Sequence, residues 1–259
     1  MKRFENKVVV ITGAGQGQGE HLAKRFYEDG ARVALLELNE DNLNKMIQEY
    51  APEEPERFRP YPIDVSNSDM VNEVFAQIAK DFGKIDFLCN NAGILRKSMI
   101  EESTDAHINL MIGVNLLGPM FCTRAAVPLM KENGGSILNV ASILATFPNT
   151  GAGAYGAAKS GMITLTRVWA AELAPYNIRV NCYSPGTIVT PMMDEIFAQH
   201  REESKLAQIP LRRFGTCEDV YNLASFFCSE EASFLTGQTI GIDGGIWATQ
   251  TPTAAWKNK

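Results

Sequence analysis

Short runs of β-branched and aliphatic residues alternate with longer segments of helical periodicity along the whole 259-residue chain. The run at residues 8–11 is apolar at every position and the run at 85–89 at every position except Asp86, as in strands buried on both faces. Over residues 69–82, apolar side chains recur every three or four positions, as on one face of a helix. This alternation predicts an α/β fold, a Rossmann-like doubly wound parallel sheet of about seven strands with helices on both faces.

The same pattern locates the expected elements. Strands are predicted over residues 8–11, 32–37, a short run ending at 63, 85–89, 136–140, 178–182 and 239–242. Helices are predicted over residues 21–27, 39–50, 69–82, 104–130, 154–173 and 219–228. No linker, repeat or low-complexity segment interrupts them, so residues 1–259 are expected to form a single domain.

Composition excludes several classes of partner. A net charge of −6 argues against nucleic acid and against an anionic membrane surface. Five scattered cysteines without C-x-x-C spacing and three distant histidines predict no metal site. The N-terminus does not resemble a signal peptide, and no stretch approaches the roughly 18 apolar residues of a membrane span. A cytoplasmic protein is expected.

A glycine-rich turn, Thr-Gly-Ala-Gly-Gln-Gly-Gln-Gly at residues 12–19, separates the first predicted strand from the first helix. Glycines let backbone N–H groups approach a pyrophosphate, and the positive end of the following helix favours that anion. The spacing is G-x-x-x-G-x-G rather than the general G-x-G-x-x-G fingerprint. Its place between a strand and a helix predicts a dinucleotide site.

Glu37 ends the second predicted strand and indicates which dinucleotide is bound. A carboxylate there can accept hydrogen bonds from the adenosine ribose 2′-OH and would repel a 2′-phosphate. Its neighbours Leu38 and Asn39, like Gln16 in the turn, supply no cation for such a phosphate. NAD is therefore predicted over NADP. The alternative is a solvated carboxylate at the end of a strand.

Tyr155 and Lys159 stand four positions apart in a predicted helix and share one face. A phenol titrates near about pH 10, and an ammonium about 4 Å away at an effective dielectric of about 20 favours the phenolate by about 4 kcal/mol. The pair therefore predicts an acid/base group usable near neutral pH. Ser142, just past a predicted strand, could hold the substrate oxygen and stabilise its developing charge. A Y-x-x-x-K pair by itself is a weak indication.

Taken together, these ordered motifs resemble the short-chain dehydrogenase/reductase family, in its branch of compact single-domain enzymes. The resemblance covers nearly the whole chain. Its motifs are the turn at residues 12–19, Asp64-Val65, Asn90-Asn91-Ala92-Gly93, Val114-Asn115, Ser142, Tyr155-x-x-x-Lys159, Pro185-Gly186 with Ile188 and Thr190, Gly237-Gln238, and Asp243-Gly244-Gly245.

The resemblance implies an NAD-dependent oxidoreductase that moves a hydride between the cofactor and a secondary alcohol or its ketone. It implies four catalytic residues. Tyr155 would exchange the proton, and Lys159 would lower its pKa and hold the nicotinamide ribose. Ser142 would orient the carbonyl, and Asn115 would hold a water that continues the proton relay.

The resemblance also implies a set of cofactor contacts, in which Asp64 and Val65 meet the adenine while Ile188 and Thr190 hold the carboxamide. The full set is Gly13, Gln16, Gly17, Gln18, Gly19, Glu37, Asp64, Val65, Asn91, Ala92, Gly93, Tyr155, Lys159, Pro185, Ile188 and Thr190. Gln18 departs from the aliphatic residue usual in the family. It either presents a polar group to cofactor or substrate, or caps the helix.

The resemblance implies substrate contacts from the segments after the fourth, fifth and sixth strands, and a lid is expected around residues 187–209. The residues concerned are Ser142, Leu144, Tyr155 and Met192, with Ile94, Leu95, Arg96, Thr146, Phe147, Met193, Phe197 and Trp247 nearby. This mostly apolar set favours a cyclic or aliphatic alcohol. The helices carrying Asn115 and Tyr155 are apolar on more than one face, which predicts a homotetramer or a dimer.

Alternative functions stay open at this point. Within the family, the chain could be a 3-oxoacyl-thioester reductase, a polyol or sugar dehydrogenase, or a hydroxysteroid dehydrogenase. Thioester reductases usually use NADP and a basic docking patch, and Glu37 argues against NADP. A sugar-nucleotide epimerase would need a longer chain. A nucleotide-sensing protein without turnover would be expected to lack one of the four catalytic residues.

Overall fold

Within the residues that the computed structural model describes (2–193, 202–251 and 253–258), seven parallel strands form one sheet in the order β3-β2-β1-β4-β5-β6-β7. The strands are β1 Val8–Thr12, β2 Arg32–Glu37, β3 Phe58–Pro62, β4 Phe87–Asn90, β5 Gly135–Val140, β6 Ile178–Pro185 and β7 Thr239–Ile242. Every pairing between neighbours is parallel. The predicted α/β fold with a parallel sheet is confirmed.

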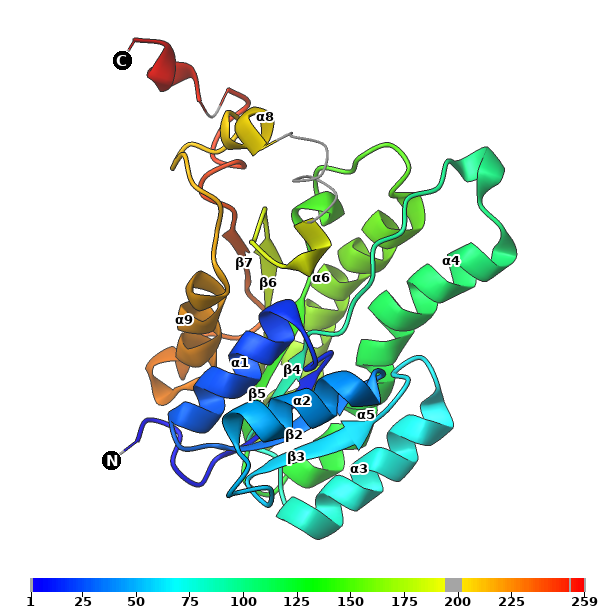
Figure 1. Cartoon of the computed structure of the whole chain (residues 1–259), viewed down its shortest axis with the longest axis vertical. Coiled ribbons are helices and arrows are strands. Elements are labelled where there is room, and N and C mark those ends of the chain that lie inside the picture. Colours follow the sequence, from blue (N-terminus) through cyan, green and yellow to red (C-terminus); the bar gives the residue numbers. More distant parts are fainter. Residues whose placement is uncertain (1, 194–201, 252, 259) are drawn as a thin grey trace.

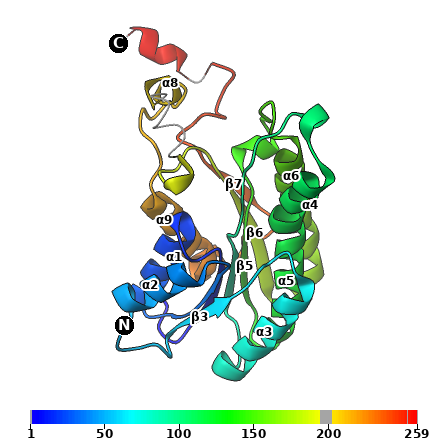
Figure 2. The ribbon, with the colours of Figure 1, turned by 45° about the vertical axis from the view of Figure 1, so that its right-hand side comes forward.

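Helices cover both faces of this sheet (Figures 1 and 2). The α-helices are α1 Gly17–Glu28, α2 Glu40–Tyr50, α3 Ser68–Phe82, α4 Asp105–Ile112, α5 Gly118–Met130, α6 Gly153–Leu173, α8 Glu202–Leu206 and α9 Cys217–Cys228. Figure 2 shows α1, α2 and α9 on one face, with α3 to α6 on the other. The shorter segments are 3-10 turns at Ile100–Glu102, Ile143–Ala145, Ala174–Tyr176, Pro191–Met193, Glu230–Ala232 and Ala254–Asn258, and a π-helical turn at Gly113–Leu117.

Most predicted boundaries lie within two residues of the observed ones, and three elements differ by more. The first helix begins at Gly17 rather than at His21, because it starts inside the glycine turn itself. Strand β6 continues to Pro185, since β7 pairs with its last four residues. The long helix predicted over residues 104–130 is divided into α4 and α5 by the π-helical turn.

Two apolar layers hold the sheet between its helices. Strand β1 is buried at every position, as expected for the centre of a doubly wound sheet. On the α1 face, Phe26 packs edge-on against Phe4 and Tyr221, with ring centroids 5.0 and 5.2 Å apart. On the opposite face, Val71, Phe75 and Ile78 of α3 belong to the second layer. The strands are therefore fixed in register beneath the edge where their carboxyl ends meet.

The segment Asp105–Met130 is long and apolar enough to cross a membrane by length and composition alone. The expectation that no stretch comes near this limit was wrong. In the fold, however, Met111, Cys122, Ala126 and Met130 of this segment are buried in the protein. Helix α5 packs against α3 and strand β4. The segment is apolar because it is a core helix, which is consistent with a soluble domain.

Replacing Phe26 by alanine tests the α1-side core. We expect Phe26→Ala to lower the free energy of unfolding by about 3–5 kcal/mol, because the ring is fully buried between two other aromatics. The matched control is Ile100→Ala, a large-to-small change at a side chain that is 86% exposed. It should change the free energy by less than about 0.5 kcal/mol. Urea unfolding followed by circular dichroism measures both, and equal losses would contradict this account of the core.

Candidate active site

The turn between β1 and α1 is so tight that two of its positions admit only glycine. Gly13 has a φ of +62°, and a methyl group placed on it would lie 2.8 Å from the Cα atom of Ala92. A methyl group on Gly19 would overlap the Gly13 carbonyl oxygen. Gln16 precedes α1 in an extended conformation and makes no side-chain cap. The first N–H groups of α1 are therefore uncapped by this side chain, as an anion site at a helix N-terminus requires.

The loop after β4 is fastened to this turn by hydrogen bonds. The Asn91 side-chain amide donates to the carbonyl oxygens of Thr12 and Gly13, at 3.0 and 3.1 Å. The Ala92 backbone N–H donates to the Thr12 hydroxyl at 2.9 Å. Three of the predicted cofactor contacts, Gly13, Asn91 and Ala92, are thus brought together by the fold.

The Glu37 carboxylate lies at the rim of the same turn. One oxygen accepts from the Gly15 N–H at 3.1 Å, and the other accepts from the N–H groups of Leu38 and Asn39 at 2.9 and 3.0 Å. The carboxylate is therefore held by backbone donors rather than by a cation. These hydrogen bonds tie the carboxylate to the turn, whereas the alternative interpretation was a carboxylate that only faces solvent at the end of a strand.

Asp64 and Val65 follow β3, one strand farther from the turn. One Asp64 oxygen accepts from both the backbone N–H and the hydroxyl of Ser66, at 2.9 and 2.7 Å. Val65 is buried, and a methyl group on Gly118 would lie 2.9 Å from it. The loop after β3 is therefore ordered by its own contacts and packs on the start of α5.

Tyr155, Lys159 and Ser142 converge where β5 ends. Lys159 is 3% exposed, and its Nζ atom donates to the Val140 carbonyl at 2.8 Å and lies 5.8 Å from the centre of the Tyr155 ring. Ser142 is buried directly after β5, and its Oγ accepts from the Leu144 N–H at 3.1 Å. The Ser142 hydroxyl is near enough to the Tyr155 phenol to influence its pKa. Helix α6 and the end of β5 together position these groups.

Asn115 lies in the π-helical turn and is fully buried. Its Oδ1 accepts from the Ile94 N–H at 3.2 Å, and its Nδ2 donates to the carbonyls of Ile94 and Met111 at 3.0 and 2.9 Å. Both hydrogens of Nδ2 are therefore in use, and the side chain fixes the loop after β4. A methyl group on Gly93 would lie 3.0 Å from Asn115 Oδ1 and 3.3 Å from Lys159 Nζ, so these two side chains meet there.

The segment after β6 passes over the start of α1. Pro185 ends β6, and Ile188 is buried and bridges to Gly215. A methyl group on Gly17 would lie 3.4 Å from the Thr190 side chain. Of the predicted lid, residues 194–201 lie outside the described residues, as does the side chain of Met192, so their predicted roles are untested.

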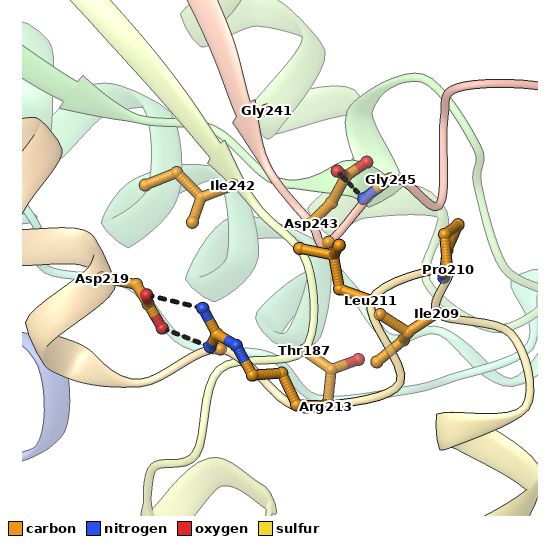
Figure 3. Close-up of a pocket in the computed structure, with 12 residues that line it drawn as sticks. Thr187, Ile209, Pro210, Leu211, Arg213, Asp219, Gly241, Ile242, Asp243 and Gly245 are labelled. Atoms are coloured by element: carbon orange, nitrogen blue, oxygen red, sulfur yellow. Dashed lines mark hydrogen bonds and ion pairs between the residues drawn. The ribbon is translucent and has the colours of Figure 1, made fainter.

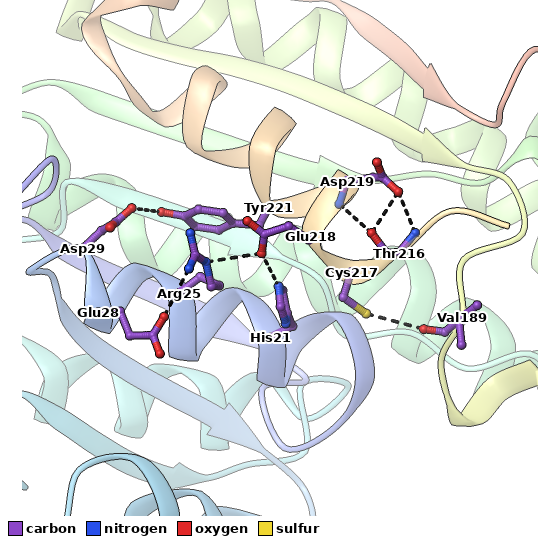
Figure 4. A network of polar contacts seen from close by, with 10 residues as sticks. All are labelled: His21, Arg25, Glu28, Asp29, Val189, Thr216, Cys217, Glu218, Asp219 and Tyr221. Atoms are coloured by element: carbon purple, nitrogen blue, oxygen red, sulfur yellow. Dashed lines mark hydrogen bonds and ion pairs between the residues drawn. The ribbon is translucent and has the colours of Figure 1, made fainter. Parts of the chain in front are cut away.

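Helix α9 contacts this segment and supports it (Figure 4). The Cys217 thiol contacts the Val189 carbonyl at 3.6 Å, and Glu218 pairs with His21 and Arg25 of α1 at 2.8 and 3.3 Å. The Arg25 guanidinium lies over the Tyr221 ring at 4.8 Å. Helices α1 and α9 are therefore locked together beneath the turn and the segment that passes over it.

Gln18 does not cap α1, so that interpretation was wrong. Its side-chain Oε1 accepts instead from the hydroxyl of Tyr183 on β6, at 3.1 Å. Sequence analysis missed Tyr183 because a tyrosine within a buried strand looks like ordinary core. The signal available was the coincidence of two polar side chains, Gln18 and Tyr183, in otherwise apolar surroundings.

Comparison with known proteins agrees with this geometry. A solved structure described as short-chain dehydrogenase/reductase SDR:Glucose/ribitol dehydrogenase, from Brucella melitensis, matches with a TM-score of 0.90 and 37% identity. The match covers 95% of this chain and 99% of that one. The family model described as Enoyl-(Acyl carrier protein) reductase matches residues 13–247. The chain belongs to the short-chain dehydrogenase/reductase family.

Two curated relatives of this family are similar over nearly their whole length. A protein named 3-oxoacyl-[acyl-carrier-protein] reductase FabG, from Thermotoga maritima, is 40% identical over 245 residues, or 94% of this chain and 99% of the relative. An uncharacterized oxidoreductase, YxbG, from Bacillus subtilis is 36% identical over 261 residues, or 97% and 95%. The chain is thus an oxidoreductase of the short-chain dehydrogenase/reductase family, which uses a nicotinamide cofactor.

Burial shifts the pKa values of the two titratable groups in this dehydrogenase/reductase site. It raises the pKa of Tyr155, and the nearby Ser142 hydroxyl acts in the opposite direction. It lowers the pKa of Lys159 to about 8. The expectation that the ammonium alone brings the phenol close to pH 7 was therefore wrong for the free protein. The loss of water on burial disfavours the charged form of each group.

An aromatic pair lies at the outer side of the site. The rings of Phe147 and Trp247 are 5.7 Å apart, although one precedes α6 and the other follows β7. Leu144, between Ser142 and Phe147, is partly buried, and Arg96 is exposed. The structure thus brings Trp247 to the predicted apolar segments, and Arg96 remains on the surface.

A separate cavity of about 410 Å³ lies beyond the ends of β6 and β7 (Figure 3). It is lined by Thr187, Ile209–Leu211, Arg213, Gly215, Asp219 and Gly241–Gly245. Arg213, the cation in this lining, is held by both carboxylate oxygens of Asp219 at 2.7 and 2.9 Å. The cavity contains none of the four predicted catalytic residues, and its arginine is already neutralised.

Among the described residues, no cluster of metal-binding side chains occurs.

The lowered pKa of Lys159 predicts a pH-dependent stability effect. An unfolded lysine titrates near about 10.4, so the charged form is disfavoured in the fold, and its cost is largest below pH 8. Between about pH 8 and 10 only the unfolded chain binds this proton, so stability rises with pH. We expect Lys159→Met to stabilise the free protein at pH 7 by up to about 3 kcal/mol. The gain should vanish towards pH 10.

Urea unfolding of the free protein at pH 7, 8, 9 and 10 measures this effect. Lys80→Met, at an exposed position on α3, is the matched control and should shift all four values alike by a small amount. A difference between wild type and Lys159→Met that stays constant over this range would contradict the lowered pKa.

Proposed function

We propose that this chain interconverts a secondary alcohol and a ketone by NAD-dependent hydride transfer, with Tyr155 as the proton-transfer group. The observation that supports this most is the convergence of Tyr155, Lys159, Ser142 and Asn115 at the carboxyl edge of the sheet. This edge, beside the glycine turn, is where doubly wound folds bind dinucleotides and their substrates.

In this proposal Ser142 and Tyr155 hold the substrate oxygen between their hydroxyl groups. During oxidation the alcohol proton passes to the Tyr155 oxygen, and during reduction the same oxygen returns it. When bound, the nicotinamide accepts or supplies the hydride, and in its oxidised form it adds a positive charge near the phenol. That charge, the Lys159 ammonium and the Ser142 hydroxyl together oppose the effect of burial on the Tyr155 pKa.

Lys159 and Asn115 would connect Tyr155 to the solvent. One Lys159 hydrogen is engaged by Val140, which leaves two for the cofactor ribose and a water molecule. Both Asn115 Nδ2 hydrogens are engaged by backbone carbonyls. A water of the proton relay would therefore be held by the Asn115 backbone carbonyl, in a π-helical turn whose hydrogen-bond register is shifted.

The remaining predicted contacts would form the NAD site. The uncapped first turn of α1 suits the pyrophosphate, with Gly13, Gln16, Gly17 and Gly19 around it. Glu37 supports NAD over NADP, because its carboxylate is tied to the turn by backbone donors that leave its negative charge unbalanced. Residues 14–18 and 37–39 contain no lysine or arginine for a 2′-phosphate.

A second candidate is reduction of a 3-oxoacyl thioester. The name of the Thermotoga maritima relative favours it. The description of the matching family model names an acyl-carrier substrate as well, but one that is reduced at a C=C bond rather than at a 3-oxo group. The Brucella melitensis structure, described as a glucose/ribitol dehydrogenase, instead favours a polyol or sugar alcohol. A panel of secondary alcohols with NAD⁺ and of 3-oxoacyl thioesters with NADH and NADPH separates them. Thioester reduction faster with NADPH than any reaction with NAD⁺ or NADH would overturn both the proposed cofactor and the simple-alcohol substrate.

We further propose a cytoplasmic homotetramer or dimer. Helices α5 and α6 carry partly exposed apolar side chains on the face turned away from the sheet, including Met120 and Val168. A helix that is apolar on its outer face as well as its inner one is commonly packed on both sides.

Removing the Tyr155 hydroxyl tests the proposed chemistry. We expect Tyr155→Phe to lower kcat by at least about 10²-fold, because no acid/base group then reaches the substrate oxygen. NADH binding, measured by quenching of protein fluorescence, should stay within about twofold. Tyr176→Phe is the matched control, at an exposed tyrosine whose ring contacts Lys131, and should leave kcat unchanged. A Tyr155→Phe variant that keeps its kcat would show that another group transfers the proton.

Removing the charge of Glu37 tests the cofactor preference. Glu37→Gln keeps one acceptor oxygen for the ribose and backbone contacts but no longer repels a 2′-phosphate. We expect the ratio of kcat/KM for NADH over NADPH to fall about tenfold or more, which corresponds to about 1.4 kcal/mol. Asp41→Asn, which removes an exposed charge on the neighbouring helix, should leave this ratio unchanged. Equal changes in the two variants would contradict a specific role of Glu37.

A further inference from the structure

The contact between Gln18 and Tyr183 joins the first turn of α1 to the underside of the sheet at β6. Tyr183 is 1% exposed, and its hydroxyl donates to the Gln18 side chain. Burial among Cys89, Cys182 and Cys217 raises the pKa of the Tyr183 phenol well above its ordinary value. The hydroxyl therefore keeps its proton and, being buried, needs an acceptor for it.

This requirement fixes the orientation of the Gln18 amide. Only Oε1 of that amide can accept a hydrogen bond, so Oε1 is turned towards Tyr183 and Nε2 is turned away. Among the described residues, none accepts a hydrogen bond from Nε2, and Nε2 is not sealed from solvent. Both N–H donors of this oriented amide are thus left unused by the described residues.

The topology places these donors on the nicotinamide side of the cofactor site. Glu37 follows β2, on one side of β1, whereas Tyr155 and Ser142 lie beyond β4 and β5 on the other. A dinucleotide across the turn after β1 therefore has its adenosine half over β2 and its nicotinamide half towards β6. Gln18 is tied to β6, and its neighbour Gly17 faces Thr190, so Gln18 belongs to the second half.

We propose that Tyr183 is a positioning residue that holds Gln18 Nε2 towards the cofactor, where Nε2 donates a hydrogen bond to the carboxamide oxygen of the nicotinamide. This inference rests on the nicotinamide-dependent function proposed above. The simpler alternative is that the pair only fastens α1 to the sheet. The two interpretations differ in what they predict for a ligand that lacks the nicotinamide ring.

The experiment compares NADH with ADP-ribose, which keeps the adenosine, both phosphates and the second ribose but lacks the nicotinamide. Dissociation constants are measured by calorimetry for wild type, Gln18→Leu, Tyr183→Phe and the double variant Gln18→Leu/Tyr183→Phe. NADPH and its 2′-phospho-ADP-ribose counterpart are measured in parallel, because the effect should not depend on the 2′-substituent. Thermal unfolding of each free variant reports the structural contribution of the pair.

We expect Gln18→Leu to weaken dinucleotide binding about 3- to 10-fold, as expected for the loss of one hydrogen bond, with ADP-ribose binding unchanged within about twofold. Tyr183→Phe should weaken the same ligand in the same direction but less, since Nε2 is then free to turn. In the double variant the buried hydroxyl that Gln18→Leu leaves without an acceptor is gone as well, so thermal stability should recover relative to Gln18→Leu. The loss of nicotinamide-dependent affinity should not recover.

Tyr50→Phe is the matched control. The Tyr50 hydroxyl of α2 donates at 3.0 Å to Glu20, which lies on α1 like Gln18. This variant therefore loses a comparable hydrogen bond on the α2 side of α1, away from the nicotinamide half of the proposed cofactor site. It should change neither affinity. Equal weakening of NADH and ADP-ribose by Gln18→Leu, or weakening of neither, would overturn the positioning role. If neither NADH nor NADPH binds the wild type more tightly than ADP-ribose does, the proposed function itself fails, and this inference fails with it.

Discussion

The close approach of the β1–α1 turn to the loop after β4 is the contact on which the rest of the site depends. At Gly13 the two backbones are so near that a single methyl group would separate them, and Asn91 and Thr12 tie them with three hydrogen bonds. Since the turn also begins α1, this contact sets the position of the helix N-terminus relative to the carboxyl ends of β4 and β5. A displacement there would move the anion site relative to Tyr155, although the two are far apart in sequence.

Burial is the second constraint, and it acts against the charges that the chemistry needs. Lys159 is enclosed beneath the Val140 carbonyl, and Tyr155 lies beside it. Burial therefore raises the pKa of Tyr155 and lowers that of Lys159, which favours the neutral form of each. In the free protein Tyr155 is thus kept neutral, and its phenolate becomes favourable only when further positive charge arrives. In the proposed reaction such a site would couple its acid/base state to occupancy, because the ligand that supplies the charge would be the one that takes part in the reaction.

Much of this architecture could be predicted from the sequence, because buried parallel strands and amphipathic helices have distinct periods. The positions of β2 and β7 and the turn after β1 follow from local pattern alone. The π-helical turn at Asn115 could not be predicted, because it depends on the hydrogen bonds of Asn115 with Ile94, which is distant in sequence. The pKa of Tyr155 was misjudged for a similar reason. Spacing reveals a neighbouring charge, whereas burial depends on the whole surrounding fold.

The contact between Gln18 and Tyr183 could not be inferred from the motifs of the family. The motifs of a family indicate what its members share, and a polar residue within one of them, such as Gln18, stands out only as a departure. Its partner lies in a strand whose pattern requires nothing but apolar character, so only the folded chain shows that the two side chains meet. A buried phenol that must donate a hydrogen bond leaves the glutamine one orientation. In the proposed arrangement, Tyr183 therefore orients the donor that Gln18 offers to the cofactor, although Tyr183 itself need not touch a ligand.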